Sequence, residues 1–255
     1  MRIPRWLRAL ALGVVPCLVL AAAAPRRVEL TVSAAASLRD VLTEVARAYQ
    51  AQAPDVVLTF NFGASGALQH QVEQGAPVDV FISAAKQQLD ALEDRGLLLQ
   101  GTRAVLARNE LVVISAKDSA LQLSDLVTTE VRRVALGEPG SVPAGTYARE
   151  ALTSLGMWDA LRTKLVYAKD VRQVLTYVES GNVEAGLVYA TDARSSARVR
   201  VVTTLPAGSH APIVYPVAAV RATRNPDEAR RFIQFLQGPA TRGILVHHGF
   251  LPPTP

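Results

Sequence analysis

The sequence is short of cysteine, of low-complexity tracts and of blocks of like charge, and each shortage excludes a class of protein. Its only cysteine is Cys17, so the rest of the chain can form neither an internal disulfide nor a cysteine metal site. No Gly-, Ser- or Gln-rich tract and no internal repeat is present, which argues against a disordered or repeat protein. The chain has 255 residues, 49% of them hydrophobic, so it can bury the cores of two modest domains.

Residues 1–24 differ from the rest and have the order of a secretory signal peptide. Arg2, Arg5 and Arg8 precede the apolar run 9–20, and small residues follow that run. This order predicts a signal that is cleaved near residue 24. A transmembrane anchor is the alternative, but the run is shorter than the roughly 18–20 apolar residues that span a bilayer.

Cleavage of this segment changes what the cysteine and the charge imply. Cys17 follows Pro16 rather than the small residue expected before a lipidated cysteine, so lipidation is the lesser alternative. Loss of the three arginines lowers the formal net charge from +5 to about +2, and no polybasic patch remains. The sequence therefore gives no reason to expect a nucleic-acid partner or a membrane surface.

Strand-like and helix-like hydrophobic patterns alternate from residue 28 onward. The strands predicted in the first part of the chain are 28–33, 56–60 and 78–83, and the helices are 38–50, 65–75 and 85–95. This alternation predicts an α/β fold with a largely parallel sheet covered on both faces. Ligands in such folds lie beyond the carboxyl ends of the strands.

The later part of the chain repeats this alternation. Strands are predicted within 106–116 and at 133–136, 164–167, 185–189 and 215–220, and helical segments at 121–127, after Pro143, at 170–180, 226–237 and 239–248. The late strand and the last two helices suggest a return to the first domain. We therefore predict one lobe from 25–107 plus 217–255, a second lobe from 108–216, and a cleft between them. A single larger sheet is the alternative.

Four predicted helix beginnings share one character. They lie at Ser37, at Ser65, in the turn 142–145 and at 170–171. Helix beginnings carry unpaired N–H groups and favour negative charge, and the alanines and glycines around the two serines let a ligand approach the backbone. Taken one at a time, each is an ordinary cap or turn, and Ser37 with Asp40 has the spacing of a capping box. Together they predict a site for a small oxyanion.

Five stretches, in order, resemble the substrate-binding proteins of bacterial molybdate ABC importers, the ModA family. They are VSAAASLRDVLTEVARAY, FGASGALQHQVEQGAPVDVFISA, SVPAGTYAREAL, KDVRQVL and GLVYATDA. The resemblance implies a two-lobed type II periplasmic binding protein fold with no catalytic activity. It also implies a monomer in the periplasm, with no cofactor, that closes on one molybdate or tungstate and delivers it to the transporter's membrane permease.

The resemblance also implies the residues that hold the oxyanion. Ser37 and Ser65 would each offer a hydroxyl and a backbone N–H, Ala144 and Val171 a backbone N–H only, and Tyr189 a phenolic hydroxyl. The molybdenum would be bound as molybdate through these groups, with no protein ligand to the metal itself. A pocket made only of donors is expected to reject phosphate because that anion keeps a proton, and sulfate because of cavity size. The sequence does not rank molybdate against tungstate.

Three alternatives stay open at this point. One is a receptor for sulfate or another oxyanion, and another is an effector-sensing module of the same fold. The third is an exported hydrolase with Ser37 or Ser65 as nucleophile, which would need a histidine base within hydrogen-bond reach. The four histidines lack the spacing of metal-binding helices, and Arg172, near the predicted cleft, is expected to steer anions without touching them.

Overall fold

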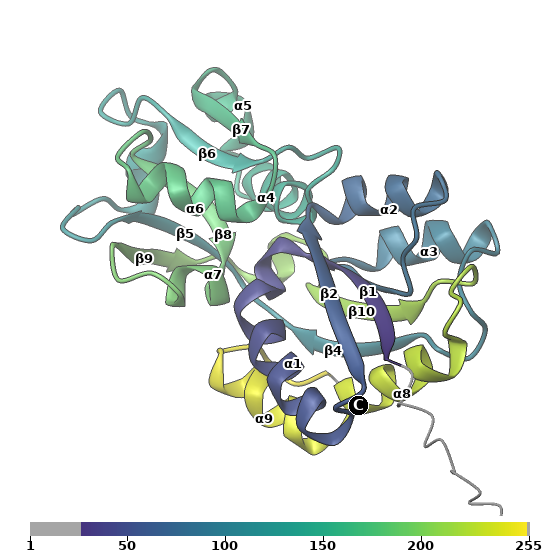
Figure 1. Cartoon of the computed structure of the whole chain (residues 1–255). Coiled ribbons are helices and arrows are strands. Elements are labelled where there is room, and N and C mark those ends of the chain that lie inside the picture. Colours follow the sequence, from purple (N-terminus) through teal and green to yellow (C-terminus); the bar gives the residue numbers. More distant parts are fainter. Residues whose placement is uncertain (1–26, 254–255) are drawn as a thin grey trace, which may run out of the picture.

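The computed structural model describes residues 27–253, so the predicted signal peptide and Cys17 lie outside the described residues. Two five-stranded sheets, each with its own helices, form the two lobes seen in Figure 1. Among residues 27–253, no helix combines the length and the apolar character that crossing a membrane requires. The two-lobed α/β architecture predicted from the sequence is confirmed, and the single larger sheet is not formed.

The first sheet has the strand order β2-β1-β3-β10-β4. Its strands are β1 (Val28–Ala35), β2 (Val56–Gly63), β3 (Val80–Ile82), β4 (Ala104–Arg108) and β10 (Val214–Ala219). Helices α1 (Arg39–Gln52), α8 (Pro226–Leu236) and α9 (Pro239–His247) pack together on one face, and α2 (Ser65–Glu73) and α3 (Lys86–Asp94) lie on the other. This sheet and its helices are called the first lobe.

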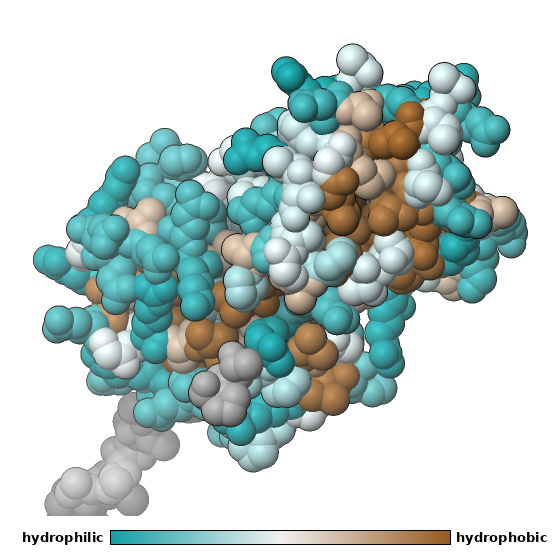
Figure 2. Space-filling model, turned by 180° about the vertical axis from the view of Figure 1, so that it is seen from behind, coloured by the Kyte–Doolittle hydropathy of each residue, from teal (hydrophilic) through white to brown (hydrophobic). Residues whose placement is uncertain are grey.

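The second sheet has the strand order β7-β6-β8-β5-β9. Its strands are β5 (Leu111–Ala116), β6 (Val134–Gly137), β7 (Leu165–Ala168), β8 (Ala185–Tyr189) and β9 (Val199–Thr204). The helices α4 (Pro143–Ser154), α5 (Trp158–Leu161), α6 (Val171–Glu179) and α7 (Ala190–Arg194) accompany it, with 3₁₀ turns η2 (Leu123–Val127), η3 (Arg162–Lys164) and η4 (Ala207–Ser209). This sheet and its helices are called the second lobe, whose rear surface carries hydrophobic residues among hydrophilic ones (Figure 2).

The prediction of largely parallel sheets is wrong for half of the strand pairs. β1 runs parallel to β2 and β3, and β6 runs parallel to β7 and β8. In contrast, β10 is antiparallel to β3 and β4, and β5 is antiparallel to β8 and β9. β5 and β10 each enter their sheet directly from the other lobe. No crossover helix precedes them to bring the chain back parallel to a neighbouring strand.

The chain passes between the lobes twice. It leaves the first sheet after β4, which ends at Arg108, and enters the second sheet at Leu111. It returns between the end of β9 at Thr204 and the start of β10 at Val214. The end of β4 and the start of β10, both in the first sheet, therefore reach slightly into the range 108–216 that the sequence analysis gave to the second lobe.

The hydrophobic pattern explains why α1 packs where it does. Val41, Leu42, Val45 and Tyr49 are its buried residues, and they recur at the three- and four-residue spacing that keeps one face of a helix toward the core. Tyr49 packs its ring against Phe232 of α8, with the ring centroids 5.0 Å apart. This packing holds α1, which begins two residues after Ser37, against the rest of the first lobe.

Candidate functional site

One pocket between the two lobes is lined by all five residues that the resemblance implies. These are Ser37, Ser65, Ala144, Val171 and Tyr189. The pocket has about 210 Å³ of empty volume, counting the space open to solvent. Both lobes thus contribute residues to one small pocket.

The rest of the pocket wall is small or apolar. Apart from Asp170, its other lining residues carry no charge: Ala35, Ala36, Gly63, Ala64, Ala84, Val142 and Pro143. The carboxylate of Asp170 caps α6 by accepting a hydrogen bond from the N–H of Gln173 at 2.9 Å. The charge of Asp170 is therefore engaged at the start of its own helix, and no lysine, arginine or histidine lines the pocket.

Helix beginnings from both lobes supply the pocket wall. α2 begins at Ser65 in the first lobe, while α4 begins at Pro143 and α6 at Val171 in the second lobe. The first N–H groups of a helix have no acceptor inside that helix and carry its positive dipole end. The predicted positions of Pro143 as a first helical residue and of Asp170 as a cap are confirmed.

The capping box predicted for Ser37 and Asp40 is wrong, whereas the predicted beginning of a helix at Ser65 is confirmed. Ser37 lies inside the 3₁₀ turn η1 (Ala36–Leu38), whose preceding residue Ala35 makes no side-chain cap, and no capping box with Asp40 forms. Ser65 is the first residue of α2, and its cap position is taken by Ala64. The serine hydroxyls make tertiary hydrogen bonds instead, which a local sequence pattern does not encode.

The hydroxyl of Ser65 is held as a donor. Its Oγ accepts a hydrogen bond from the backbone N–H of Ala84 at 3.0 Å, and the residue is buried. A hydroxyl has one proton and two lone pairs, so this contact leaves the Ser65 proton free to point at a ligand in the pocket. The Oγ of Ser37 lies 3.1 Å from the hydroxyl of Tyr215.

Tyr189 presents a buried hydroxyl that has no hydrogen-bond partner among the described residues. The residue ends β8, is 1% exposed, and lines the pocket. Burial raises its pKa well above the ordinary value of a tyrosine, so the phenol keeps its proton. An unpaired buried hydroxyl costs about 1–3 kcal/mol, and such a group in a pocket calls for a bound acceptor.

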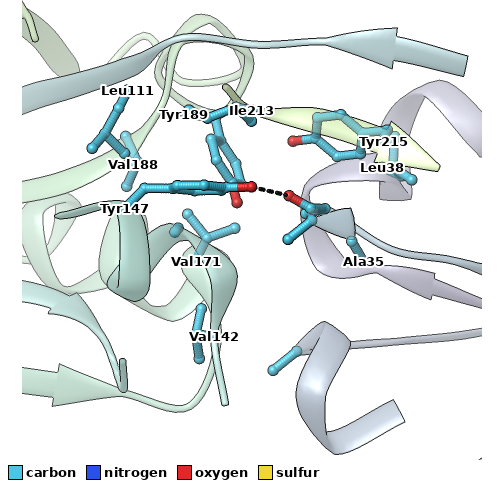
Figure 3. Close-up of a cluster of buried hydrophobic side chains, with 14 of the residues drawn as sticks. Ala35, Leu38, Leu111, Val142, Tyr147, Val171, Val188, Tyr189, Ile213 and Tyr215 are labelled. Carbon is cyan, nitrogen blue, oxygen red and sulfur yellow. Dashed lines mark hydrogen bonds between the residues drawn. The ribbon is translucent and has the colours of Figure 1, made fainter. Parts of the chain in front are cut away.

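Two further tyrosines surround this hydroxyl, as Figure 3 shows. The ring of Tyr215 lies edge-on to that of Tyr189, with the centroids 5.9 Å apart. Tyr147 of α4 reaches across the lobes and donates to the backbone oxygen of Ala84 at 3.4 Å. The sequence analysis gave neither residue a role: Tyr147 lies in the stretch SVPAGTYAREAL without being assigned to the ligand, and Tyr215 lies outside the five stretches.

The lobes touch at two more places beside the pocket. The N–H of Gly66, in α2, donates to the backbone oxygen of Ser141 in the second lobe at 2.9 Å. Arg172, predicted to steer anions, does not line the pocket; its guanidinium pairs with Asp40 of α1 across the lobes. The same guanidinium lies 2.8 Å from the buried carboxylate of Asp192, so it also holds a charge that would otherwise be isolated.

Two alternatives, serine hydrolysis and metal binding, can be checked against the described part of the chain. No histidine there forms a hydrogen bond with Ser37 or Ser65, so neither serine has the base that a hydrolase requires. Between residues 27 and 253, no three His, Cys, Asp or Glu side chains are grouped closely enough to hold a metal ion. The pocket can therefore bind by hydrogen bonds, and it lacks the groups for serine catalysis.

Comparison with known proteins gives consistent matches over this whole region. The family model of the bacterial extracellular solute-binding proteins matches residues 30–251. The molybdate-binding protein ModA of Haemophilus influenzae is 40% identical over 228 residues, 87% of this chain and 89% of that protein, and ModA of Escherichia coli is 38% identical over 231 residues, 87% and 88%. The solved periplasmic molybdate-binding protein of Azotobacter vinelandii superposes with a TM-score of 0.81 at 27% identity, covering 88% of this chain and all of that one.

Proposed function

Because the chain belongs to the bacterial extracellular solute-binding proteins and, among them, to the ModA family, we propose that it captures molybdate between its two lobes and delivers it to an ABC transporter. It is a transport receptor and not an enzyme. The protein works outside the cytoplasm, in agreement with the family, and the periplasm and the cleaved signal peptide are part of the proposal. Its partner is the membrane permease of that transporter.

The observation that carries the proposal is the unpaired hydroxyl of Tyr189 in a pocket without cationic side chains. A fully ionised oxyanion accepts hydrogen bonds at every oxygen, and each bond from a neutral donor to a charged acceptor is worth roughly 1.5–3 kcal/mol. We assign the donors to the hydroxyls of Ser37, Ser65 and Tyr189 and to the backbone N–H groups of those serines, Ala144 and Val171. Several such bonds offset much of the desolvation of a small dianion.

The same assignment gives a closing mechanism. Ser37 and Ser65 lie in the first lobe, and the other three residues lie in the second lobe. An anion that contacts both sets at once favours the closed arrangement, because the open arrangement offers it only the donors of one lobe. We propose lobe limits of 25–107 plus 217–255 and 108–216, with the strand ends noted above, and a monomer as the working unit.

The donor set also predicts which anions bind. Tungstate has the charge and nearly the size of molybdate, so we propose that both bind. A protonated phosphate needs an acceptor in the pocket, and the carboxylate of Asp170 already accepts from Gln173. Sulfate is fully ionised but smaller, so its oxygens cannot reach all of the donors together.

Titration calorimetry of the mature chain with molybdate, tungstate, sulfate and phosphate tests the proposal. We expect one bound molybdate or tungstate per chain and much weaker binding of the other two anions. Tight sulfate binding without molybdate binding would assign the protein to the sulfate alternative. Absence of heat with all four anions, in protein shown to be folded by circular dichroism, would contradict the proposed function altogether.

A further inference from the structure

A buried hydrogen-bond chain leads from the pocket to the two connections between the lobes. Tyr215 is the second residue of β10, directly after the returning connection, and Asn109 lies in the outgoing connection between β4 and β5. Both residues are buried, and neither lines the pocket. The hydroxyl of Tyr215 lies 3.1 Å from Ser37 Oγ and 3.2 Å from Asn109 Nδ2.

The orientation of the Asn109 amide determines the direction of this chain. Asn109 Oδ1 accepts a hydrogen bond from the backbone N–H of Glu110 at 2.9 Å. The oxygen is therefore on that side, and Nδ2 faces both the hydroxyl of Tyr215 and, at 2.8 Å, Oγ1 of Thr191 in α7. An amide nitrogen carries two protons and accepts none, so Asn109 donates to both oxygens.

The donor role of Asn109 determines the donor and acceptor roles of the next two hydroxyls, those of Tyr215 and Ser37. Tyr215 uses a lone pair to accept from Asn109, and its one proton can only be donated to the remaining neighbour, Ser37 Oγ. Burial raises the pKa of Tyr215 far above its ordinary value, so that proton stays in place at physiological pH. Ser37 Oγ becomes an acceptor from Tyr215, and the proton of Ser37 is left for the pocket.

We propose that Tyr215, oriented by Asn109, is a positioning residue that holds the hydroxyl of Ser37 as a hydrogen-bond donor to the bound oxyanion. The inference rests on the proposed function and adds a residue to its machinery. Tyr215 thereby leaves the hydroxyl of Ser37 as a donor to the pocket, as the N–H of Ala84 does for the hydroxyl of Ser65. Both serines then point protons at the ligand, and the pocket rejects an anion that carries a proton of its own.

A double-mutant cycle on the mature protein separates this role from a structural one. Molybdate affinity is measured by calorimetry for the wild type, Tyr215→Phe, Ser37→Ala and the double variant. We expect Tyr215→Phe to weaken binding by about three- to tenfold, the range for loss of one neutral hydrogen bond. In the Ser37→Ala background the same change should alter affinity by less than about twofold, because the group through which Tyr215 acts is gone.

Tyr49→Phe is the matched control. The hydroxyl of Tyr49 is also buried and donates to Glu228 of α8. Helix α8 lies at the end of the first lobe away from the second lobe (Figure 1). This variant loses a buried tyrosine hydrogen bond without touching the chain from Asn109 to Ser37, so its molybdate affinity should equal that of the wild type. If Tyr215→Phe does not fold, Asn109→Leu takes its place in the cycle, with a smaller loss that also disappears in the Ser37→Ala background.

The outcomes distinguish the two proposals. Wild-type protein that binds no molybdate contradicts the proposed function. Wild-type binding with unchanged affinity in Tyr215→Phe overturns only the role of Tyr215. Equal losses from Tyr215→Phe in the presence and absence of the Ser37 hydroxyl would also overturn it, because they would show that Tyr215 acts on the fold instead of on Ser37.

Discussion

Gly66 provides the sharpest test of how closely the lobes approach when the anion is bound. It is the second residue of α2, and its N–H donates to the backbone oxygen of Ser141 in the facing lobe. A Cβ atom placed on Gly66 would lie 2.6 Å from that oxygen and 2.9 Å from Ser141 Cα. Both are backbone atoms, so no side-chain rotation can relieve the contact.

Gly66→Ala should therefore weaken molybdate binding while leaving the fold intact. Overpacking a close contact costs about 1–3 kcal/mol, and here the cost falls on the closed arrangement only, because separation of the lobes gives the methyl group room. If closure accompanies binding, the apparent affinity drops by roughly five- to 150-fold. The ligand-free variant should unfold at nearly the wild-type temperature.

Two measurements check this reasoning. Calorimetry gives the affinity, and thermal unfolding with and without molybdate gives the ligand-induced rise in melting temperature, which should be smaller in the variant. Gly243→Ala in α9 is the control, since a Cβ there meets no atom within 4 Å. A Gly66→Ala protein that binds molybdate as tightly as the wild type would refute the view that the bound lobes meet at Ser141.

Three further predictions concern single side chains. Tyr189→Phe should weaken molybdate binding by about 1–3 kcal/mol in calorimetry, and an unchanged affinity would contradict its role as a donor. Asp40→Asn removes the pair with Arg172 between the lobes; since both partners are partly exposed, the loss of affinity should stay below about 1 kcal/mol and vanish in high salt. Burial raises the pKa of Asp192 to about 7 despite the nearby Arg172. The native state thus holds this proton more tightly than the unfolded state, so the unfolding free energy should fall as pH rises from about 4 to 7. Urea unfolding across this range should show a shallower slope in Asp192→Asn.

The local parts of the site could be predicted from the sequence because short-range rules determine them. The spacing of apolar residues located α1, and Pro143 and Asp170 marked the beginnings of α4 and α6. A proline fixes the φ angle that a first helical turn needs, and an aspartate satisfies an otherwise unpaired N–H. Neither effect depends on the rest of the fold.

The roles of the polar side chains could not be predicted in the same way. Ser37 has the spacing of a cap with Asp40, yet its hydroxyl bonds Tyr215, 178 residues away in the chain. Asn109 lies in a segment without any motif, and its importance comes from a tertiary contact 106 residues away with Tyr215. Local propensity gave the wrong function to one serine and no signal at all for Asn109, because tertiary packing overrides a cap that is worth only about 1 kcal/mol.

The difference between short-range rules and tertiary structure also explains the error in strand direction. Alternating strand and helix patterns imply parallel neighbours only while each helix crosses back over the sheet. β5 and β10 each follow a connection from the other lobe, and nothing in their residues records which sheet precedes them. Only the three-dimensional path of the chain shows that these strands run against their neighbours.

A pocket of neutral donors has a physical advantage for a receptor that must also release its ligand. A lysine or arginine in the first lobe would keep attracting a dianion after the lobes separate. In the proposed site, the donors are divided between Ser37 and Ser65 in the first lobe and Ala144, Val171 and Tyr189 in the second lobe, so they would act fully only when both lobes contact the ion. Opening the lobes would remove one lobe's donors together and return water to the rest, so the affinity would fall steeply with separation. Any force from the permease that opens the cleft would thereby be converted into release of the anion.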